Sequence, residues 1–418
     1  MDDSVTNYRR RIAVVYPFGN LETLPTLKAF LAVASAAGVG VDVFARADPM
    51  YPDVRDLPSG ARLCEVDEGA FSVPLPAPGL SVGSARHHLR TLYWELRRRH
   101  AVDRVIRDAV RLQGSSSYSC VIAVDPESAH CADALAARLR LPLVYWSLEI
   151  QCGEPSRGAA GWLRRAELTA SRKADLWVTQ DSWRAELLAD KNGLDLADSV
   201  LVPNSPLGQA GRTYDSSFRE RAGLPAEAFM ALSAGSIRPW ACSLELAEAA
   251  SAWSEGRCLL LHSRQLEYRY GHAYVDEVMK HVDSRHVYAS FASVPADQYR
   301  QVVNSADVGV ALYNPCVHEG DAAPDPNLVV MGYSSGKLAM YLMCGLPVIV
   351  SDSIGPRDLV RRFACGLVVR SASEVDEALT AIEQDYERFS SNAVRCFSEV
   401  LDPAPAVTCL LEKLLEYE

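Results

Sequence analysis

The sequence predicts an α/β protein built from two Rossmann-like domains, and three observations carry that prediction. The chain has 418 residues, more than one hydrophobic core usually organises, so two domains are the default expectation. Short apolar runs alternate with amphipathic stretches of helical length, the pattern of a parallel sheet covered by helices on both faces. The alternation stops at Pro203-Asn204-Ser205-Pro206, where two prolines are incompatible with a central strand. The domains should therefore cover residues 1–204 and 205–400.

The predicted elements follow the same rhythm in both halves. In the first half we expect strands at 12–16, 39–44, 120–124, 143–146, 176–179 and 200–202, with helices at 24–34 and 128–139. In the second half we expect strands at 230–233, 258–261, 287–289, 308–312 and 348–350, with helices at 244–253, 296–304 and 337–343. Leucines at 410, 411, 414 and 415 predict a last helix within 401–418 that packs back on the first domain.

Composition excludes several classes of protein. Apolar residues make up 49% of the chain and charged residues 23%, which is ordinary for a globular protein. The net charge of −11 gives no basic face for a phosphate backbone, so no nucleic-acid partner is expected. No apolar window is long enough for a transmembrane segment, and the first residues, Met1-Asp2-Asp3, are acidic where a secretory signal would be basic. These features predict a cytoplasmic protein.

The most informative loop is Gly332-Tyr333-Ser334-Ser335-Gly336-Lys337, which leads directly into a predicted helix. A serine can cap the free amides at a helix start, and a glycine lets a ligand approach the backbone. The start of a helix also carries partial positive charge, so this loop favours a phosphate group. The alternative is a plain capped helix, because such helix starts are common.

The residues that follow resemble a known signature. Ser335 to Ser351 is similar to the donor-site segment of glycosyltransferase family four, in which a Ser-x-Lys-Leu-type helix leads to a Gly-x-Pro-Val-Ile strand. Similarity to the same family extends to Ser305–Leu312, Val202-Pro203-Asn204, Ala234–Ile237, Asp352–Leu359 and Gly366–Val369. The resemblance implies the GT-B fold, in which two Rossmann-like domains face each other across a cleft. It also implies transfer of a sugar from a nucleoside diphosphate sugar with retention of configuration, without metal and without any other cofactor.

Candidate donor-binding residues come from this resemblance and from the loops that follow predicted strands. Gly19 and Asn20 follow the first strand of the chain, and Gly235, Ser236 and Arg238 follow the first strand of the second half. The Ser334, Ser335, Gly336 and Lys337 amides, with the Lys337 ammonium, should face the phosphates. Arg238 is the second candidate cation, and a solvated surface arginine is the alternative for it. Glu319 and Asp321, in an acidic loop, are candidate acceptors for sugar hydroxyls; the alternative is a solvated loop.

Three residues of the first half are candidates for the catalytic base. Asp125 and His130 follow a predicted strand and are candidates for a pair near the acceptor hydroxyl. His130 falls within a predicted helix, so the alternative for it is a side chain that packs against its neighbours without a catalytic role. Glu149 follows the 143–146 strand; the similar family pattern often has a histidine just before this glutamate, where this chain has Leu148.

The chain also departs from the family pattern. Many members carry two glutamates eight residues apart across the donor helix, and the aligned positions here hold Gly332 and Met340. Family members usually carry a lysine early in the second domain; the aligned position in this chain is Ala241 or one of its neighbours, and no lysine is present there. Two other functions therefore stay open: a non-catalytic GT-B subunit that supports a partner, and a GT-B nucleotide-sugar epimerase. Neither the acceptor nor the oligomeric state follows from the sequence.

Overall fold

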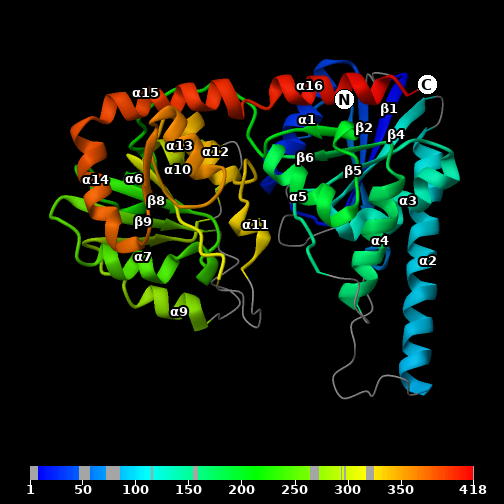
Figure 1. Cartoon of the computed structure of the whole chain (residues 1–418), viewed down its shortest axis with the longest axis horizontal. Coiled ribbons are helices and arrows are strands. Elements are labelled where there is room, and N and C mark those ends of the chain that lie inside the picture. The colour runs from blue at the N-terminus through cyan, green and yellow to red at the C-terminus, as the bar shows by residue number, and fades with distance from the viewer. Residues whose placement is uncertain are drawn as a thin grey trace. The chain divides into compact units, whose positions relative to one another are not determined.

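The contacts of the chain define two compact units, Met1–Val202 with Ala404–Glu418, and Pro203–Pro403. The computed structural model describes residues 8–46, 57–71, 85–113, 116–153, 159–263, 273–292, 294–295, 298–316 and 324–417. Each unit contains one parallel sheet flanked by helices (Figure 1), so the predicted α/β class is confirmed.

The sheet of the first unit has seven parallel strands in the order β3-β2-β1-β4-β5-β6-β7. Their bounds are β1 Arg10–Tyr16, β2 Gly40–Arg46, β3 Ala61–Val66, β4 Ser117–Val124, β5 Leu143–Trp146, β6 Leu176–Thr179 and β7 Ser199–Leu201. The helices are α1 Pro25–Ala36, α2 Ala85–Gln113, α3 Asp125–Leu139, α4 Ala159–Lys173, α5 Ser182–Asn192 and α16 Ala404–Leu415, with short turns η1 Leu21–Thr23, η2 Glu68–Ala70 and η3 Leu196–Asp198.

The sheet of the second unit has six parallel strands in the order β10-β9-β8-β11-β12-β13. Their bounds are β8 Phe229–Ala234, β9 Arg257–His262, β10 Val287–Ser290, β11 Val308–Ala311, β12 Val348–Ser351 and β13 Gly366–Val369. The helices are α6 Ser217–Ala222, α7 Ser243–Ala250, α9 Ala273–Met279, α10 Tyr299–Asn304, α11 Pro326–Val329, α12 Gly336–Met343, α13 Pro356–Phe363, α14 Val375–Gln384 and α15 Tyr386–Cys396, with η4 Pro239–Ala241, η5 Ala372–Glu374 and the π-helical turn η6 Phe397–Leu401.

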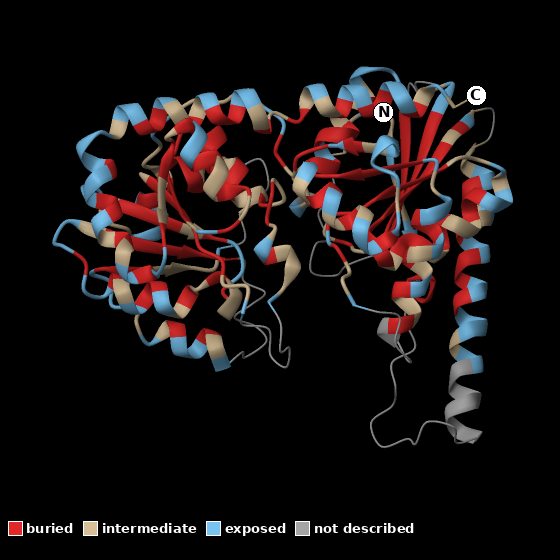
Figure 2. Ribbon diagram, in the orientation of Figure 1, coloured by how far each residue is buried: buried red, intermediate tan, exposed pale blue. Residues whose placement is uncertain are grey.

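Alternating side chains of the strands enter different core layers. In β1, Ile12 and Val14 pack with α1 and α16, whereas Ala13 and Val15 pack with α2 and α3. All four side chains are fully buried. Because both faces of a parallel sheet are covered, its strands appear in the sequence as continuous apolar runs, which is why the central strands could be predicted (Figure 2).

One strand and three α-helices of the first unit were not predicted: β3, α2, α4 and α5. Strand β3 lies at the sheet edge and is only partly buried, so it lacks a continuous apolar run. It is joined to β2 by a two-point ion pair, in which Arg62 Nε and Nη2 donate to Asp42 at 2.7 and 3.1 Å. Helix α2 was not among the predicted helices, because its composition is dominated by charge.

Candidate active site

In each unit the strand order reverses next to the first strand of the sheet, between β1 and β4 and between β8 and β11. In open parallel sheets, ligands bind beyond the carboxyl ends of the strands at such a reversal. In the second unit, the loops that meet there follow β8 and β11. Gly235 begins the first loop and Tyr313 lies in the second.

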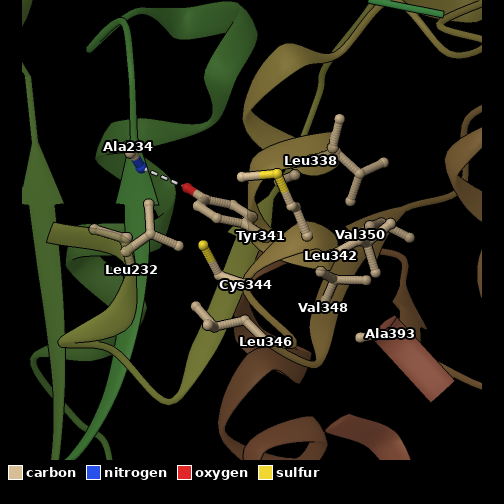
Figure 3. Close-up of a cluster of buried hydrophobic side chains, with 14 of the residues drawn as sticks. Leu232, Ala234, Leu338, Tyr341, Leu342, Cys344, Leu346, Val348, Val350 and Ala393 are labelled. Atoms are coloured by element: carbon tan, nitrogen blue, oxygen red, sulfur yellow. Dashed lines mark hydrogen bonds between the residues drawn. The ribbon is translucent and has the colours of Figure 1, made fainter. Parts of the chain in front are cut away.

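Helix α12 is packed firmly against the strands on both sides of this reversal. The Ala234 amide donates a hydrogen bond of 2.8 Å to the Tyr341 hydroxyl (Figure 3). The Tyr341 ring lies against Gly309 of β11 so closely that a Cβ there would come within 2.2 Å of the ring. Leu338 and Leu342 join the same buried cluster. These contacts hold the amino terminus of α12 at the carboxyl edge of the sheet.

The first turn of α12 presents unpaired backbone amides. Ser335 is the N-cap residue, and its hydroxyl accepts a hydrogen bond from the Leu338 amide at 3.3 Å. The same hydroxyl lies 2.6 Å from the Tyr313 hydroxyl, which ties the helix start to the loop after β11. The amides of Gly336 and Lys337 have no intrahelical acceptor, because the first turn of an α-helix has none. They are therefore available to an anion at a site where the helix dipole favours negative charge.

The Lys337 side chain lies over the Tyr313 ring beside this helix start. Its Nζ lies 5.0 Å from the centre of the Tyr313 ring, and Trp240 stacks on that ring with centroids 6.3 Å apart and an interplanar angle of 7°. Burial lowers the pKa of Lys337 to about 8, against a weaker opposing influence of Cys242. Within the described ranges no carboxylate forms an ion pair with Lys337. A desolvated ammonium without a counter-charge is suited to an anionic ligand.

The loop after β8 passes directly beside Lys337. A Cβ at Gly235 would lie 4.0 Å from Lys337 Cδ, and Gly235 has φ +107, a conformation that favours glycine. Gly235 and Ser236 are exposed, and Arg238 is partly buried just before η4. The structure thus brings Gly235 and Lys337 together, while phosphate binding by Ser236 and Arg238 stays a prediction.

Ser334 has a different role from the one expected. Its amide and its hydroxyl both donate to the Met331 carbonyl, at 3.1 and 2.7 Å. Its own carbonyl accepts a hydrogen bond of 2.9 Å from Asn204 Nδ2, and the Asn204 amide donates to the Tyr333 carbonyl at 2.9 Å. This corrects the expectation for the Ser334 amide, which is satisfied within a turn. The Val-Pro-Asn segment supplies the side chain that holds the turn in place.

The position aligned with the first family glutamate is Gly332, whose φ is +55. The Gly332 amide donates a hydrogen bond to the Ile354 carbonyl at 2.9 Å. Gly355 is also close to Gly332, because a Cβ added at Gly355 would lie 2.4 Å from Gly332 Cα. This left-handed backbone favours glycine, so the local structure accounts for the absence of a glutamate. Glu319 and Asp321, the predicted substitutes, lie outside the described residues.

At the strand reversal of the first unit, Gly19 is buried and Asn20 is partly buried, immediately before η1. Asn20 Oδ1 accepts a hydrogen bond of 2.7 Å from the Tyr16 hydroxyl. Its backbone carbonyl accepts from the Thr23 amide at 2.9 Å. The two residues thus form an ordered turn after β1, and their contact with a donor stays a prediction.

Asp125 follows the last residue of β4, the strand that neighbours β1 in the sheet. Its carboxyl oxygen Oδ1 accepts hydrogen bonds from the Leu148 and Glu149 amides at 2.7 and 3.1 Å. The side chain is buried, and burial together with the nearby Glu149 charge raises its pKa well above the usual range. Asp125 therefore holds the loop that presents Glu149, whose side chain is exposed. Its hydrogen bonds indicate a positioning role.

His130 does not join Asp125. The two residues are five positions apart on α3, which separates their directions by about 140° around the helix. The His130 ring instead packs edge-on against Trp162 of α4, with centroids 5.5 Å apart. Burial lowers the pKa of His130, and the Arg98 charge adds to that effect. This corrects the expectation of an Asp125–His130 pair and favours the packing alternative for His130.

A second set of contacts, which was not predicted from the sequence, holds the Ser147–Glu149 backbone from the other side. Arg184 is buried, and its Nη2 donates to the Leu148 carbonyl at 2.7 Å. Its Nε donates to Gln180 Oε1 at 2.6 Å, while Gln180 Nε2 donates to the Ser147 carbonyl at 2.7 Å. The Ser147–Glu149 backbone is thus held by hydrogen bonds with Asp125 on one side and with Gln180 and Arg184 on the other. The signal available in the sequence was a glutamine and an arginine closely following the apolar β6 strand.

Two kinds of feature are absent from the described part of the chain. No group of three or more histidine, cysteine, aspartate or glutamate side chains is arranged to hold a metal ion among the residues described. None of the described helices combines the length and the apolar character needed to span a bilayer.

Two doubly wound parallel sheets, each with its loops at a strand reversal, define the GT-B fold class. A family model described as "Glucosyltransferase 3-like, C-terminal domain" matches residues 331–404, which begin just before α12. No curated protein matches the sequence.

Solved structures cover nearly the whole chain. HepE from Anabaena, in complex with UDP and glucose, is 15% identical with a TM-score of 0.65, covering 97% of this chain and 99% of that chain. Sucrose-phosphate synthase from Thermosynechococcus elongatus is 16% identical with a TM-score of 0.65, covering 98% of each chain. A glycosyltransferase from Rickettsia africae is 10% identical with a TM-score of 0.62 and 98% coverage of each chain. At these identities the likeness establishes the fold.

Proposed function

We propose that this protein is a glycosyltransferase that takes a sugar from a nucleoside diphosphate sugar and transfers it to an acceptor held by the first unit. The observation that carries this proposal is the position of the Lys337 ammonium over the Tyr313 ring, beside the free amides of Gly336 and Lys337 at the start of α12. A diphosphate matches this arrangement, because its negative charge would meet both a cation and a helix amino terminus.

We further propose UDP as the nucleotide and glucose as the sugar. The matched family model covers the whole of α12 and is described as glucosyltransferase 3-like. The structures of HepE include complexes with UDP and with UDP-glucose. These similarities support UDP-glucose as the first donor to test.

In the proposed reaction, the bond between the anomeric carbon and the diphosphate breaks and negative charge accumulates on the leaving UDP. The Lys337 ammonium and the α12 amides stabilise that charge, which lowers the barrier without a covalent role for the protein. We propose that no metal is required and that the product retains the anomeric configuration. Glu149, held by the Asp125 and Arg184 contacts, is the candidate that faces the acceptor hydroxyl.

The proposal is tested by thermal unfolding with UDP, GDP, ADP and their glucose conjugates. A ligand that binds only the folded state stabilises it by about 2.7 kcal/mol at a hundredfold excess over its Kd. We expect UDP and UDP-glucose to raise the Tm more than the other nucleotides, with or without EDTA. Lys337→Ala should lose this shift. Its matched control is Lys413→Ala, which removes an exposed lysine in α16 and should keep the shift.

Other outcomes separate the alternatives. If no nucleotide raises the Tm, the donor site is absent and a non-catalytic subunit is favoured. If UDP-glucose is converted to an isomeric nucleotide sugar without an acceptor, the protein is an epimerase. If binding requires a divalent cation, the metal-free mechanism is wrong.

The pH dependence of binding offers a separate prediction. Burial lowers the pKa of Lys337 to about 8, and the second ionisation of a phosphate, with a pKa of about 6, is nearly complete by about pH 7.5. Between about pH 7.5 and 8.5 the ligand charge is therefore nearly constant while Lys337 loses its proton. We expect the Kd for UDP to rise above pH 8, by up to about tenfold per pH unit, in calorimetric titrations. In Lys337→Arg, which keeps its charge, the curve should be flat; a flat wild-type curve would contradict the assignment.

A further inference from the structure

Helix α2 exposes three large apolar side chains that the proposed reaction does not use. Leu92, Tyr93 and Leu96 are 52%, 60% and 57% exposed. At about 100° per residue, the three fall within one third of the helix circumference. Isolated exposed leucines are common, but three neighbouring ones on one helix face form a patch.

The face of α2 that packs on the first unit is a different one. Ala101, Val102, Val105 and Ala109 are buried in the core layer shared with α3. Arg98 is buried as well, and its guanidinium lies 4.4 Å from the centre of the Trp162 ring. These residues lie on the opposite side of the helix from Leu92 and Leu96. The exposed patch is therefore not the packing face of α2, and Figure 2 shows exposed residues along the outer side of this long helix.

The same helix carries strong positive charge in an acidic protein. Residues 85–113 contain eight arginines and three acidic residues, whereas the whole chain has a net charge of −11. Arg99, Arg104 and Arg107 are exposed, and none of them forms an ion pair with a carboxylate among the described residues. Arg104 and Arg107 lie on the same outer side as the apolar patch, and Arg99 at its border.

We propose that the outer face of α2 docks the first unit on an anionic lipid surface. Leu92, Tyr93 and Leu96 enter the boundary between headgroups and acyl chains, while the three arginines contact lipid phosphates. An interfacial helix needs both features, an apolar stripe and flanking cations, and α2 combines them. A nucleic acid would use the cations but leave the leucines exposed, so the lipid surface accounts for more of the observed face.

Vesicle co-sedimentation of the full chain tests this proposal. We expect binding to vesicles of 70% phosphatidylcholine and 30% phosphatidylglycerol, weakening with salt, and much weaker binding to pure phosphatidylcholine. The combined variant Leu92→Ser, Tyr93→Ser and Leu96→Ser should lower the partition coefficient by at least about tenfold. Arg99→Glu, Arg104→Glu and Arg107→Glu together should lower it by about a hundredfold or more.

The matched control is Leu196→Ser with Leu201→Ser, which removes two exposed leucines of the same unit outside α2. It should bind as the wild type does, and all variants should keep the wild-type Tm and UDP-induced shift. Equal binding to neutral and anionic vesicles, or unchanged binding by both α2 variants, would overturn the proposal. So would a wild-type dimer in light scattering that the apolar variant dissociates, or RNA binding in place of vesicle binding.

Discussion

Replacing Lys337 with methionine is expected to weaken UDP binding by about 30- to 160-fold, because charge-assisted contacts contribute about 2–3 kcal/mol each. Methionine keeps an apolar stem against Tyr313 and removes only the ammonium, so the loss reports on charge. Isothermal titration calorimetry measures the change directly. Lys413→Met, at an exposed position, is the control that should bind UDP normally.

The same substitution should leave the free protein at least as stable as the wild type. Burial lowers the pKa of Lys337 to about 8 in the folded chain, whereas an unfolded lysine titrates near 10.4. The unfolded state therefore binds more protons between these values, and the free energy of unfolding should rise with pH from about 8 to 10. Lys337→Met should lose that rise. A variant that loses stability and UDP affinity together would instead indicate a structural role for Lys337.

Replacing Asp125 with alanine is expected to lower the free energy of unfolding by about 2–4 kcal/mol. The change leaves the Leu148 and Glu149 amides without their acceptor, and an unsatisfied buried group costs about 1–3 kcal/mol. Asp125 also has φ +61, a left-handed conformation that aspartate and asparagine tolerate better than alanine. Urea denaturation followed by tryptophan fluorescence measures the loss.

Asp125→Asn separates a positioning role from a catalytic one. The asparagine carbonyl accepts the same two hydrogen bonds and suits the same backbone, so stability should stay within about 1 kcal/mol of the wild type. If Asp125 only positions the Leu148–Glu149 loop, hydrolysis of UDP-glucose by this variant should proceed at a rate near that of the wild type. A fall of about a hundredfold or more with unchanged stability would show that Asp125 is a base.

The central strands could be predicted because the physical cause lies in the sequence itself. β5 and β6 are covered on both faces, so every residue in them is apolar or small and their bounds match the prediction. The edge strand β3 was missed because only Val66 of its residues is buried, so it has no continuous apolar run. An ion pair between Arg62 and Asp42 joins it to β2 instead. Helix α12 was predicted from its serine cap and its apolar face.

The candidate site could be predicted only in part. The sequence pattern pointed to Ser335, Gly336 and Lys337, because a cap and a helix start are local features. It did not reveal that Lys337 lies over the Tyr313 ring or that Trp240 stacks on this ring, since these residues lie 24 and 97 positions before Lys337. It also joined Asp125 to His130, which are neighbours along the chain but point to different sides of α3.

By itself, the sequence determined the α/β class and the position of the serine-capped start of α12. Both depend on periodicity and on contacts between residues a few positions apart. Only the tertiary structure decided that Lys337 has no counter-charge in its described surroundings and that Gly332 occupies a backbone conformation suited to glycine. It also decided that Asp125 and Arg184 hold the same loop by hydrogen bonds to its backbone. These properties arise from burial and from hydrogen bonds between distant segments, which periodicity does not encode.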